Sequence, residues 1–529
     1  MNTPSVVKSP SRILATALAL GLAFDILFYG KLPGLSVLLF VLLVVSVLMS
    51  LGKMGGVVPR RQNLWLLLPL IFFAAMVAVR ANPYLNALNV AACLLLLGLL
   101  AYFYAAGRLD RLGIVGYYIS PLIAGVNAVR RTAPLIPEGL DVMGLKTRGA
   151  RGARALLPFL RGLLLALPVA IVFVALLASA DIVFANWIGS LLNMQLPDVR
   201  EVLWHVMLVL SVAWVLAGGL AFAISRSGVE DGEPGESALD AEAHNIKIGF
   251  IEGAVVLTVV NLIFISFGWI QLSYMFGGQA NIAVDGFTYA DYARRGFFEL
   301  IAVSVLTMGL ILGLHNFTWR ETRLHTIIFR ALATSMVAFT GVLLTSAFYR
   351  MWMYEEAYGF THLRLAVHVF EVWLALLFVW LVFTLWRSPR RFAVGAFVAV
   401  LGFLATLNLI NLDSTIAERN LARYASTGKI DVSYLARLSE DAVPTLLANT
   451  SALRPADRDW LLSMLNTRWQ SMKQDESWKS LPSFNIARWQ AYDALEANRI
   501  ILSQAAPPDA GASLDRRSES DYLLDTSGR

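Results

Sequence analysis

The chain has 529 residues, of which 57% are hydrophobic and 15% charged, and its mean hydropathy is +0.63. This composition is too apolar for a soluble enzyme. The formal net charge of +6 indicates membrane topology and attraction to an anionic inner leaflet rather than nucleic-acid binding. The single cysteine, Cys93, excludes an internal disulfide, a CxxC redox pair and a thiolate metal cluster.

Eleven apolar runs in the sequence approach or exceed the roughly 20 residues that a helix needs to cross a bilayer. Hydrocarbon offers no water to the backbone, so each run must be helical. The predicted spans are 12–29, 33–51, 63–79, 82–104, 156–179, 202–224, 248–275, 297–316, 327–349, 365–386 and 392–410. The predicted fold class is therefore all-α, a polytopic helical membrane bundle.

The distribution of Lys and Arg predicts the orientation of the spans. Lys8 and Arg12 precede the first span, and eight Lys or Arg residues follow the fourth, whereas several intervening loops carry only one. This alternation predicts a cytoplasmic N-terminus and, after eleven crossings, a C-terminus outside. The first span is typical of an uncleaved signal anchor, because no clear small-residue cleavage site follows it.

Two stretches predicted in the cytoplasm depart from the pattern of short loops. Residues 112–129 are uncharged, about one helix long and flanked by arginines. Positive charge on both flanks favours an interfacial or re-entrant element; the alternative is a crossing, which would invert the topology downstream. Residues 227–244 are acidic and rich in Gly and Ser, which indicates a solvated loop or a docking segment.

The composition changes near residue 412, where the apolar runs shorten and charges of both signs mix with tryptophan. The spacing of Leu435, Leu438, Val443 and Leu446 suits short amphipathic helices. We therefore predict three parts. These are a transmembrane domain over 1–411, an extracytoplasmic helical domain over 412–504 and a disordered tail over 505–529.

Charged residues enter two of the apolar runs between Arg350 and Trp373. A charge in hydrocarbon costs at least about 2.5 kcal/mol, so such residues usually have a purpose. Placed by depth at about 1.5 Å per residue, they fall in the outer leaflet together with Asp25, Asn408 and Asp413. The predicted outer polar cluster comprises Arg295, Glu299, Arg350, Tyr354, Glu355, Glu356, Arg364, His368 and Glu371.

The spacings within this cluster predict contacts. Arg295 and Glu299 are four residues apart on one helix face, and Arg364, His368 and Glu371 form a second stripe. One interpretation is an ion-pair network that locks the helices. The other is a polar cavity that binds a small ligand, an ion or a proton.

Known catalytic motifs are missing from the sequence. It contains no GxxxxGK[ST] phosphate loop, no HExxH zinc helix and no GxSxG nucleophile elbow. Its six histidines are scattered, and the only close pair, His362 and His368, is six residues apart. We therefore predict no catalytic residue, no metal site and no cofactor.

Three strings in the sequence are similar to a known family. They are YADYARRGFFEL at 289–300, RMWMYEEAYGFTHLRL at 350–365 and NLDSTIAERNLARYASTGKIDVSYLARLSEDAVPTLL at 411–447. From about the fifth span to the start of the C-terminal domain, the chain resembles bacterial integral membrane proteins catalogued as a domain of unknown function (4153/4173 type). The resemblance implies a multi-pass protein of the bacterial inner membrane, and it implies no activity, cofactor or catalytic residue.

Three functions are compatible with these observations. The leading hypothesis is a non-enzymatic membrane protein with a sensory, regulatory or envelope-scaffolding role, which meets an envelope protein partner through 412–504. The second is a secondary transporter of a small or proton-coupled solute, although no repeated halves or paired broken helices are visible. The third is a membrane enzyme acting on a lipid-linked substrate, with Glu371, His368 and Arg364 as base and anion clamp. The predicted partners are the lipid bilayer and that envelope protein, with no nucleic acid; the oligomeric state stays open.

Overall fold

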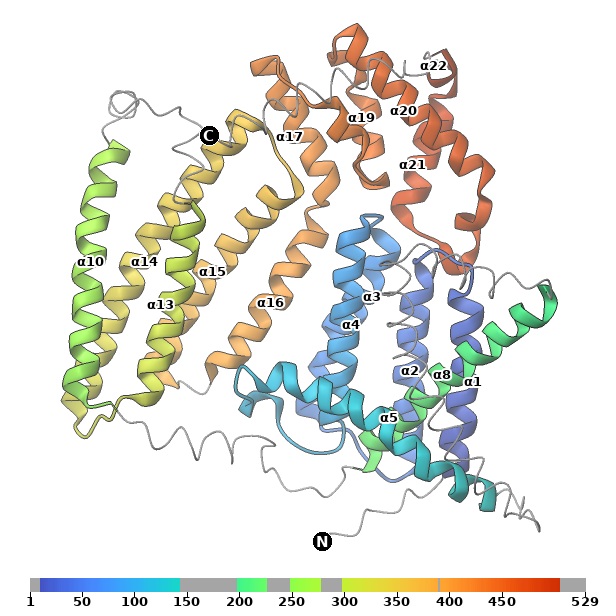
Figure 1. The fold of residues 1–529 in the computed structure, drawn as a ribbon, viewed down its shortest axis with the longest axis horizontal. Coiled ribbons are helices and arrows are strands. Elements are labelled where there is room, and N and C mark those ends of the chain that lie inside the picture. Colours follow the sequence, from blue (N-terminus) through green and yellow to red (C-terminus); the bar gives the residue numbers. More distant parts are fainter. Residues whose placement is uncertain (1–9, 143–196, 226–247, 277–296, 389–390, 505–529) are drawn as a thin grey trace, which may run out of the picture. The chain divides into compact units, whose positions relative to one another are not determined.

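The computed structural model describes residues 10–142, 197–225, 248–276, 297–388 and 391–504, and these are almost entirely helical (Figure 1). Over these ranges the only extended pairing is an isolated bridge between Ile248 and Thr318. The predicted all-α class is confirmed.

Ten described helical segments are long and apolar enough to cross a membrane. They coincide with ten of the eleven predicted spans, and the remaining prediction, 156–179, lies outside the described residues. The orientation of the spans stays a prediction. The segments are Pro10–Phe28 (α1), Leu35–Met54 (α2), Arg61–Val79 (η1 Arg61–Leu66 with α3 Leu67–Val79), Pro83–Phe103 (α4), Glu201–Ser225 (within α8), Phe250–Trp269 (within α10), Glu299–Phe317 (within α13), Arg323–Tyr358 (α14), His362–Arg387 (α15) and Phe392–Leu409 (α16).

The chain divides into two compact units. One comprises residues 1–72, 93–108 and 117–232, and the other comprises 73–92, 109–116 and 233–529. The boundary passes through α4, so the first half of this helix belongs to the second unit.

In the first unit, α1 packs against α2 and along α8 (Pro197–Ser225). A further helix, α5 (Gly116–Val142), covers most of the segment predicted to be interfacial or re-entrant, and it is not among the candidate spans. Thr132 of α5 donates a hydrogen bond to the Trp214 carbonyl at 2.6 Å, and Trp214 Nε1 donates to the Val129 carbonyl at 3.0 Å. The opposite face of α5 exposes Leu122 and Val126. Whether 112–129 crosses the bilayer stays a prediction.

In the second unit, α14 is the central helix, because it packs against α10 (Phe250–Phe276), α13 (Phe297–Phe317) and α15 (Figure 1). Its buried face includes Phe329, Ala333 and Met336. Next to it, α15 packs closely on α16, since a side chain at Gly402 would collide with the Trp373 ring. The packing of α14, α15 and their neighbours thus buries polar residues of α14 and α15, among them Glu355 and Glu371.

The C-terminal helices bury hydrophobic side chains that include Ile416, Leu435, Leu446, Leu461 and Leu495. Asn411 adopts a left-handed backbone (φ 51°) where α16 gives way to α17. The elements are α17 (Leu412–Thr427), α18 (Val432–Ala436), η5 (Glu440–Ala442), α19 (Val443–Ala448), η6 (Thr450–Ala452), α20 (Pro455–Gln474), η7 (Glu476–Lys479), η8 (Leu481–Ser483), α21 (Ile486–Ala497) and α22 (Arg499–Gln504). The placement of 412–504 outside the cytoplasm stays a prediction, and the predicted tail 505–529 lies outside the described residues.

Candidate functional site

Three members of the predicted polar cluster come together inside the helix bundle. Glu355 of α14 is 1% exposed and Glu371 of α15 is 2% exposed. His368 Nδ1 lies 3.1 Å from Glu355 Oε2. This distance is that of an ion pair, although the contact lacks hydrogen-bond geometry. Neither Glu371 oxygen has a hydrogen-bond partner among the described residues. We refer to Glu355, His368 and Glu371 as the buried carboxylate site.

The other cluster members have different surroundings. The Arg364 guanidinium lies 4.3 Å from the centre of the Tyr354 ring and donates a hydrogen bond to the Gly359 carbonyl. Arg364 therefore covers the C-terminal end of α14, where helix carbonyls lack intrahelical partners. Arg350 is buried in α14, one turn before Tyr354, and Glu356 is exposed.

The predicted pair between Arg295 and Glu299 is not tested. Glu299 is exposed in the first turn of α13, and Arg295 lies outside the described residues.

A second buried polar group is centred on Asp413 of α17, which is 1% exposed. Its carboxylate accepts hydrogen bonds from Asn82 Nδ2 at 2.9 Å and from Ser439 Oγ, and it pairs with His362 Nε2. The other ring nitrogen of His362 lies 3.0 Å from the Tyr434 hydroxyl. Burial alone would raise the pKa of Asp413, but the contacts with His362, Ser439 and Asn82 outweigh it and lower that pKa. We refer to these residues as the Asp413 network.

Asp441 extends this network to the segment before α4. One carboxylate oxygen accepts backbone N–H groups of Ala81 at 2.7 Å and Asn82 at 3.2 Å, and the other lies 3.5 Å from Arg80 Nη1. Burial raises the pKa of Asp441, and these partners oppose the rise without cancelling it. Arg80 also donates from Nε to the Asn408 carbonyl at 2.7 Å. No pattern in the sequence predicted the contact between Arg80 and Asp441.

The loop between α14 and α15 is held by α17. Asn420 accepts the Phe360 N–H at 2.9 Å and donates to the Phe360 carbonyl at 2.8 Å. Arg423 donates to the carbonyls of Glu356 and Ala357, each at 2.6 Å. Asp413 and Asn420 are seven residues apart, which places both on one face of α17. This spacing was the signal in the sequence that could have revealed a polar, buried face on this helix.

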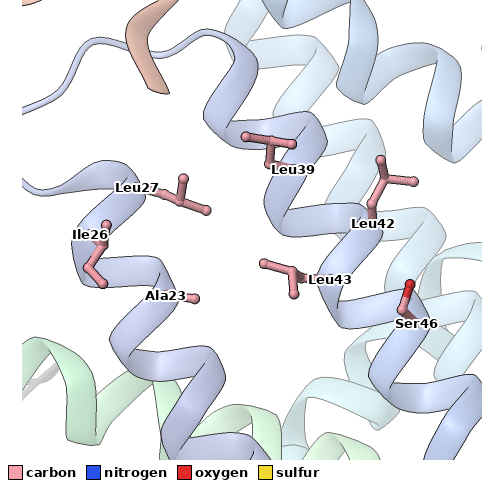
Figure 2. Close-up of a pocket in the computed structure, with 7 residues that line it drawn as sticks. All are labelled: Ala23, Ile26, Leu27, Leu39, Leu42, Leu43 and Ser46. Atoms are coloured by element: carbon pink, nitrogen blue, oxygen red, sulfur yellow. The ribbon is translucent and has the colours of Figure 1, made fainter. Parts of the chain in front are cut away.

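Two further features lie in the first unit. His205 Nδ1 approaches both oxygens of Asp25, at 2.7 and 2.8 Å, a pairing that sequence reasoning did not predict. An apolar groove with a volume of about 460 Å³ lies between α1 and α2, and Figure 2 shows the side chains that line it. It is lined by Ala23, Ile26, Leu27, Leu39, Leu42, Leu43 and Ser46. This lining is almost wholly hydrocarbon, and Ser46 supplies its one polar side chain.

No group of three or more metal-ligating side chains occurs within the part of the chain that the structure describes. Instead, the apolar helices and the two buried polar groups define a polytopic α-helical membrane protein.

The chain belongs to the family described as Domain of unknown function (DUF4153), whose model matches residues 67–449. The predicted resemblance to this family is thereby confirmed, whereas the bacterial origin and the inner membrane stay predictions. The match begins earlier than predicted, within the third span, and it includes both the buried carboxylate site and the Asp413 network. Neither the curated proteins nor the solved structures provide a match.

Proposed function

We propose that this chain is a non-enzymatic membrane protein with a sensory, regulatory or envelope-scaffolding role, and that residues 412–504 meet an envelope protein partner outside the cytoplasm. The observation that supports this proposal is the Asp413 network. It joins the C-terminal helices to the start of α15 and to the segment before α4 through buried, hydrogen-bonded contacts. A domain fixed in this way can transmit a force or a displacement to the spans, whereas a domain on a free linker cannot.

The test is site-specific photocrosslinking of the full chain in cells. Leu481 and Ile500 are exposed positions on the C-terminal domain, and Val58 is an equally exposed control in the loop predicted to be cytoplasmic. We expect discrete protein adducts from Leu481 or Ile500 and none from Val58. We also expect a membrane-impermeant thiol reagent to label cysteine at Leu481 from outside. Labelling from the cytoplasmic side only would contradict the proposal.

A second candidate function, proton-coupled transport, is favoured by the buried carboxylate site. A carboxylate that is buried without a hydrogen-bond partner is costly when charged, so a proton or a cation that neutralises it is bound favourably. Glu371 meets this description, and His368 beside Glu355 supplies a second group that can exchange protons.

The transport test uses proteoliposomes with an imposed pH gradient and a pH-sensitive dye inside. Wild-type protein should dissipate the gradient, and Glu371→Gln should not, although it elutes as the same monodisperse species. Glu356→Gln is the matched control, because this carboxylate is exposed. Equal rates for wild type and Glu371→Gln would reject proton transport through this site.

The third hypothesis, an enzyme acting on a lipid-linked substrate, used Arg364 as an anion clamp beside His368 and Glu371. The Arg364 guanidinium instead contacts Gly359 and Tyr354. No observation in the described residues favours this function.

A further inference from the structure

A group of basic side chains lies where α13 ends and α14 begins. Arg320, in the connection between these helices, folds back onto the end of α13. Its Nη1 lies 2.9 Å from His315 Nδ1, and its Nη2 donates to the His315 carbonyl at 2.6 Å. The same guanidinium lies 4.7 Å from the centre of the Phe329 ring. These contacts fix the position of a half-buried positive charge.

Arg330, two turns into α14, brings a second guanidinium close to the first. It lies 5.8 Å from the centre of the Trp386 ring of α15, and its Nε is buried without a hydrogen-bond partner in the described part of the chain. Burial and the nearby charge of Arg330 both lower the pKa of Arg320. Arg320 lies over the Phe329 ring and Arg330 is the next residue of α14, so the two positive charges lie at the same part of this helix.

No acidic side chain in the described part of the chain pairs with this charge. Among the residues that the structure describes, none of the ion pairs includes Arg320 or Arg330. The neighbouring acids Glu321 and Glu252 are exposed. Two half-buried guanidinium groups without a counter-charge are an unfavourable arrangement unless an anion joins them.

The surroundings resemble the boundary between lipid and water. Trp319 and Trp386 are about half exposed, as is typical of aromatic residues at the headgroup level, and Leu324 is exposed on the outside of α14. An anion bound here would thus lie between lipid on one side and water on the other.

We propose that Arg320 and Arg330 form a binding site for a phosphate-bearing anion, and that the headgroup of an anionic phospholipid is its occupant. Each guanidinium has five N–H donors, and Arg320 uses only two of its own on His315. The free donors of two arginines match the oxygens of a phosphate. Because His315 Nδ1 accepts from Arg320, its Nε2 carries a hydrogen that gives a further donor.

The experiment is native mass spectrometry of the full-length chain in detergent, titrated separately with phosphatidylglycerol, phosphatidylcholine and inorganic phosphate. We compare wild type, Arg320→Gln, Arg330→Gln and the double variant. Arg323→Gln is the matched control, because this arginine begins α14 and is exposed. Arg330→Lys keeps the positive charge. If it still binds lipid, and if every variant elutes like wild type without lipid, a loss of binding in Arg330→Gln reflects the lost charge and not misfolding.

We expect one phosphatidylglycerol to bind at low concentration, ahead of phosphatidylcholine, and the double variant to bind it about tenfold or more weakly. Arg323→Gln should stay within about twofold of wild type. Competition by inorganic phosphate would support the site and identify a soluble phosphate as a second source of its occupant. Equal binding of the two lipids by wild type, or unchanged phosphatidylglycerol binding by a folded double variant, would overturn the proposal.

Discussion

The replacement Asp413→Ala gives the sharpest test of how the C-terminal helices are held. It leaves the buried Asn82 amide without this acceptor, which costs about 1–3 kcal/mol. The half-buried Ser439 hydroxyl loses one hydrogen bond, worth about 1 kcal/mol, but keeps Asp441 as an acceptor at 3.2 Å. The His362 side chain is 34% exposed, so solvent screens its contribution and we discount it. We therefore expect a loss of about 3 kcal/mol, most of it from Asn82.

Hydrogen exchange of the full chain in detergent measures this loss locally. A loss of about 3 kcal/mol corresponds to exchange about a hundredfold faster in the amides of α17 and of the first turn of α15. The control is Asp459→Ala, which removes an exposed ion pair with Arg458 that contributes at most about 1 kcal/mol. Exchange in α17 within about threefold of wild type would show that the Asp413 network contributes little stability and does not hold this helix.

The pH dependence of this contribution follows from the lowered pKa of Asp413. A carboxyl group whose pKa is lower in the folded state stabilises that state above its unfolded pKa of about 4. We expect the protection of α17 to decline as the pH falls below about 4, through the folded pKa.

Three further predictions concern other parts of the chain. Burial raises the pKa of Asp441, so its contribution to the stability of the folded state is present at low pH and is lost as the pH rises through the folded pKa. Asp441→Asn should therefore flatten the decline in the hydrogen-exchange protection of α19 above about pH 4. Nitroxides at Leu122→Cys and Val126→Cys, in a Cys93→Ala background, should report equal, shallow depths if α5 lies in the interface, and depths that differ by about 6 Å if it crosses. Gly402→Ala should destabilise the contact between α15 and α16 by about 1–3 kcal/mol, measured by exchange, because the new methyl group meets a tryptophan ring; an unchanged rate would show that the ring yields freely.

The spans could be predicted because the bilayer imposes a length and a composition on each of them. The length of α14, in contrast, could not be predicted from the sequence. The apolar run ends near Tyr349, but the helix continues to Tyr358, so Glu355 lies within a packed helix rather than in a turn. Helix packing, which the local charge pattern does not reveal, decides that its carboxylate is buried.

Contacts between segments that are distant in sequence could not be predicted either. Periodicity places Arg364, His368 and Glu371 on one stripe, but Arg364 is drawn to a carbonyl at the end of the preceding helix. Asn82 and Asp413 are far apart in sequence, and no local pattern predicts that they meet. The depth given to Asp413 along the helices stays a prediction, and its partners could be found only from the fold.

The two buried polar groups are connected by a short stretch of chain. The Asp413 network holds His362 at the start of α15, and Asn420 holds Phe360 just before it. His368 lies six residues further, about 9 Å along the helix. A displacement of α17 by a bound partner would therefore reach the buried carboxylate site through one rigid helix. The coupling free energy between these two groups decides between the proposed roles: a pure scaffold needs none, whereas a sensor or a gated transporter requires that each group alter the affinity of the other.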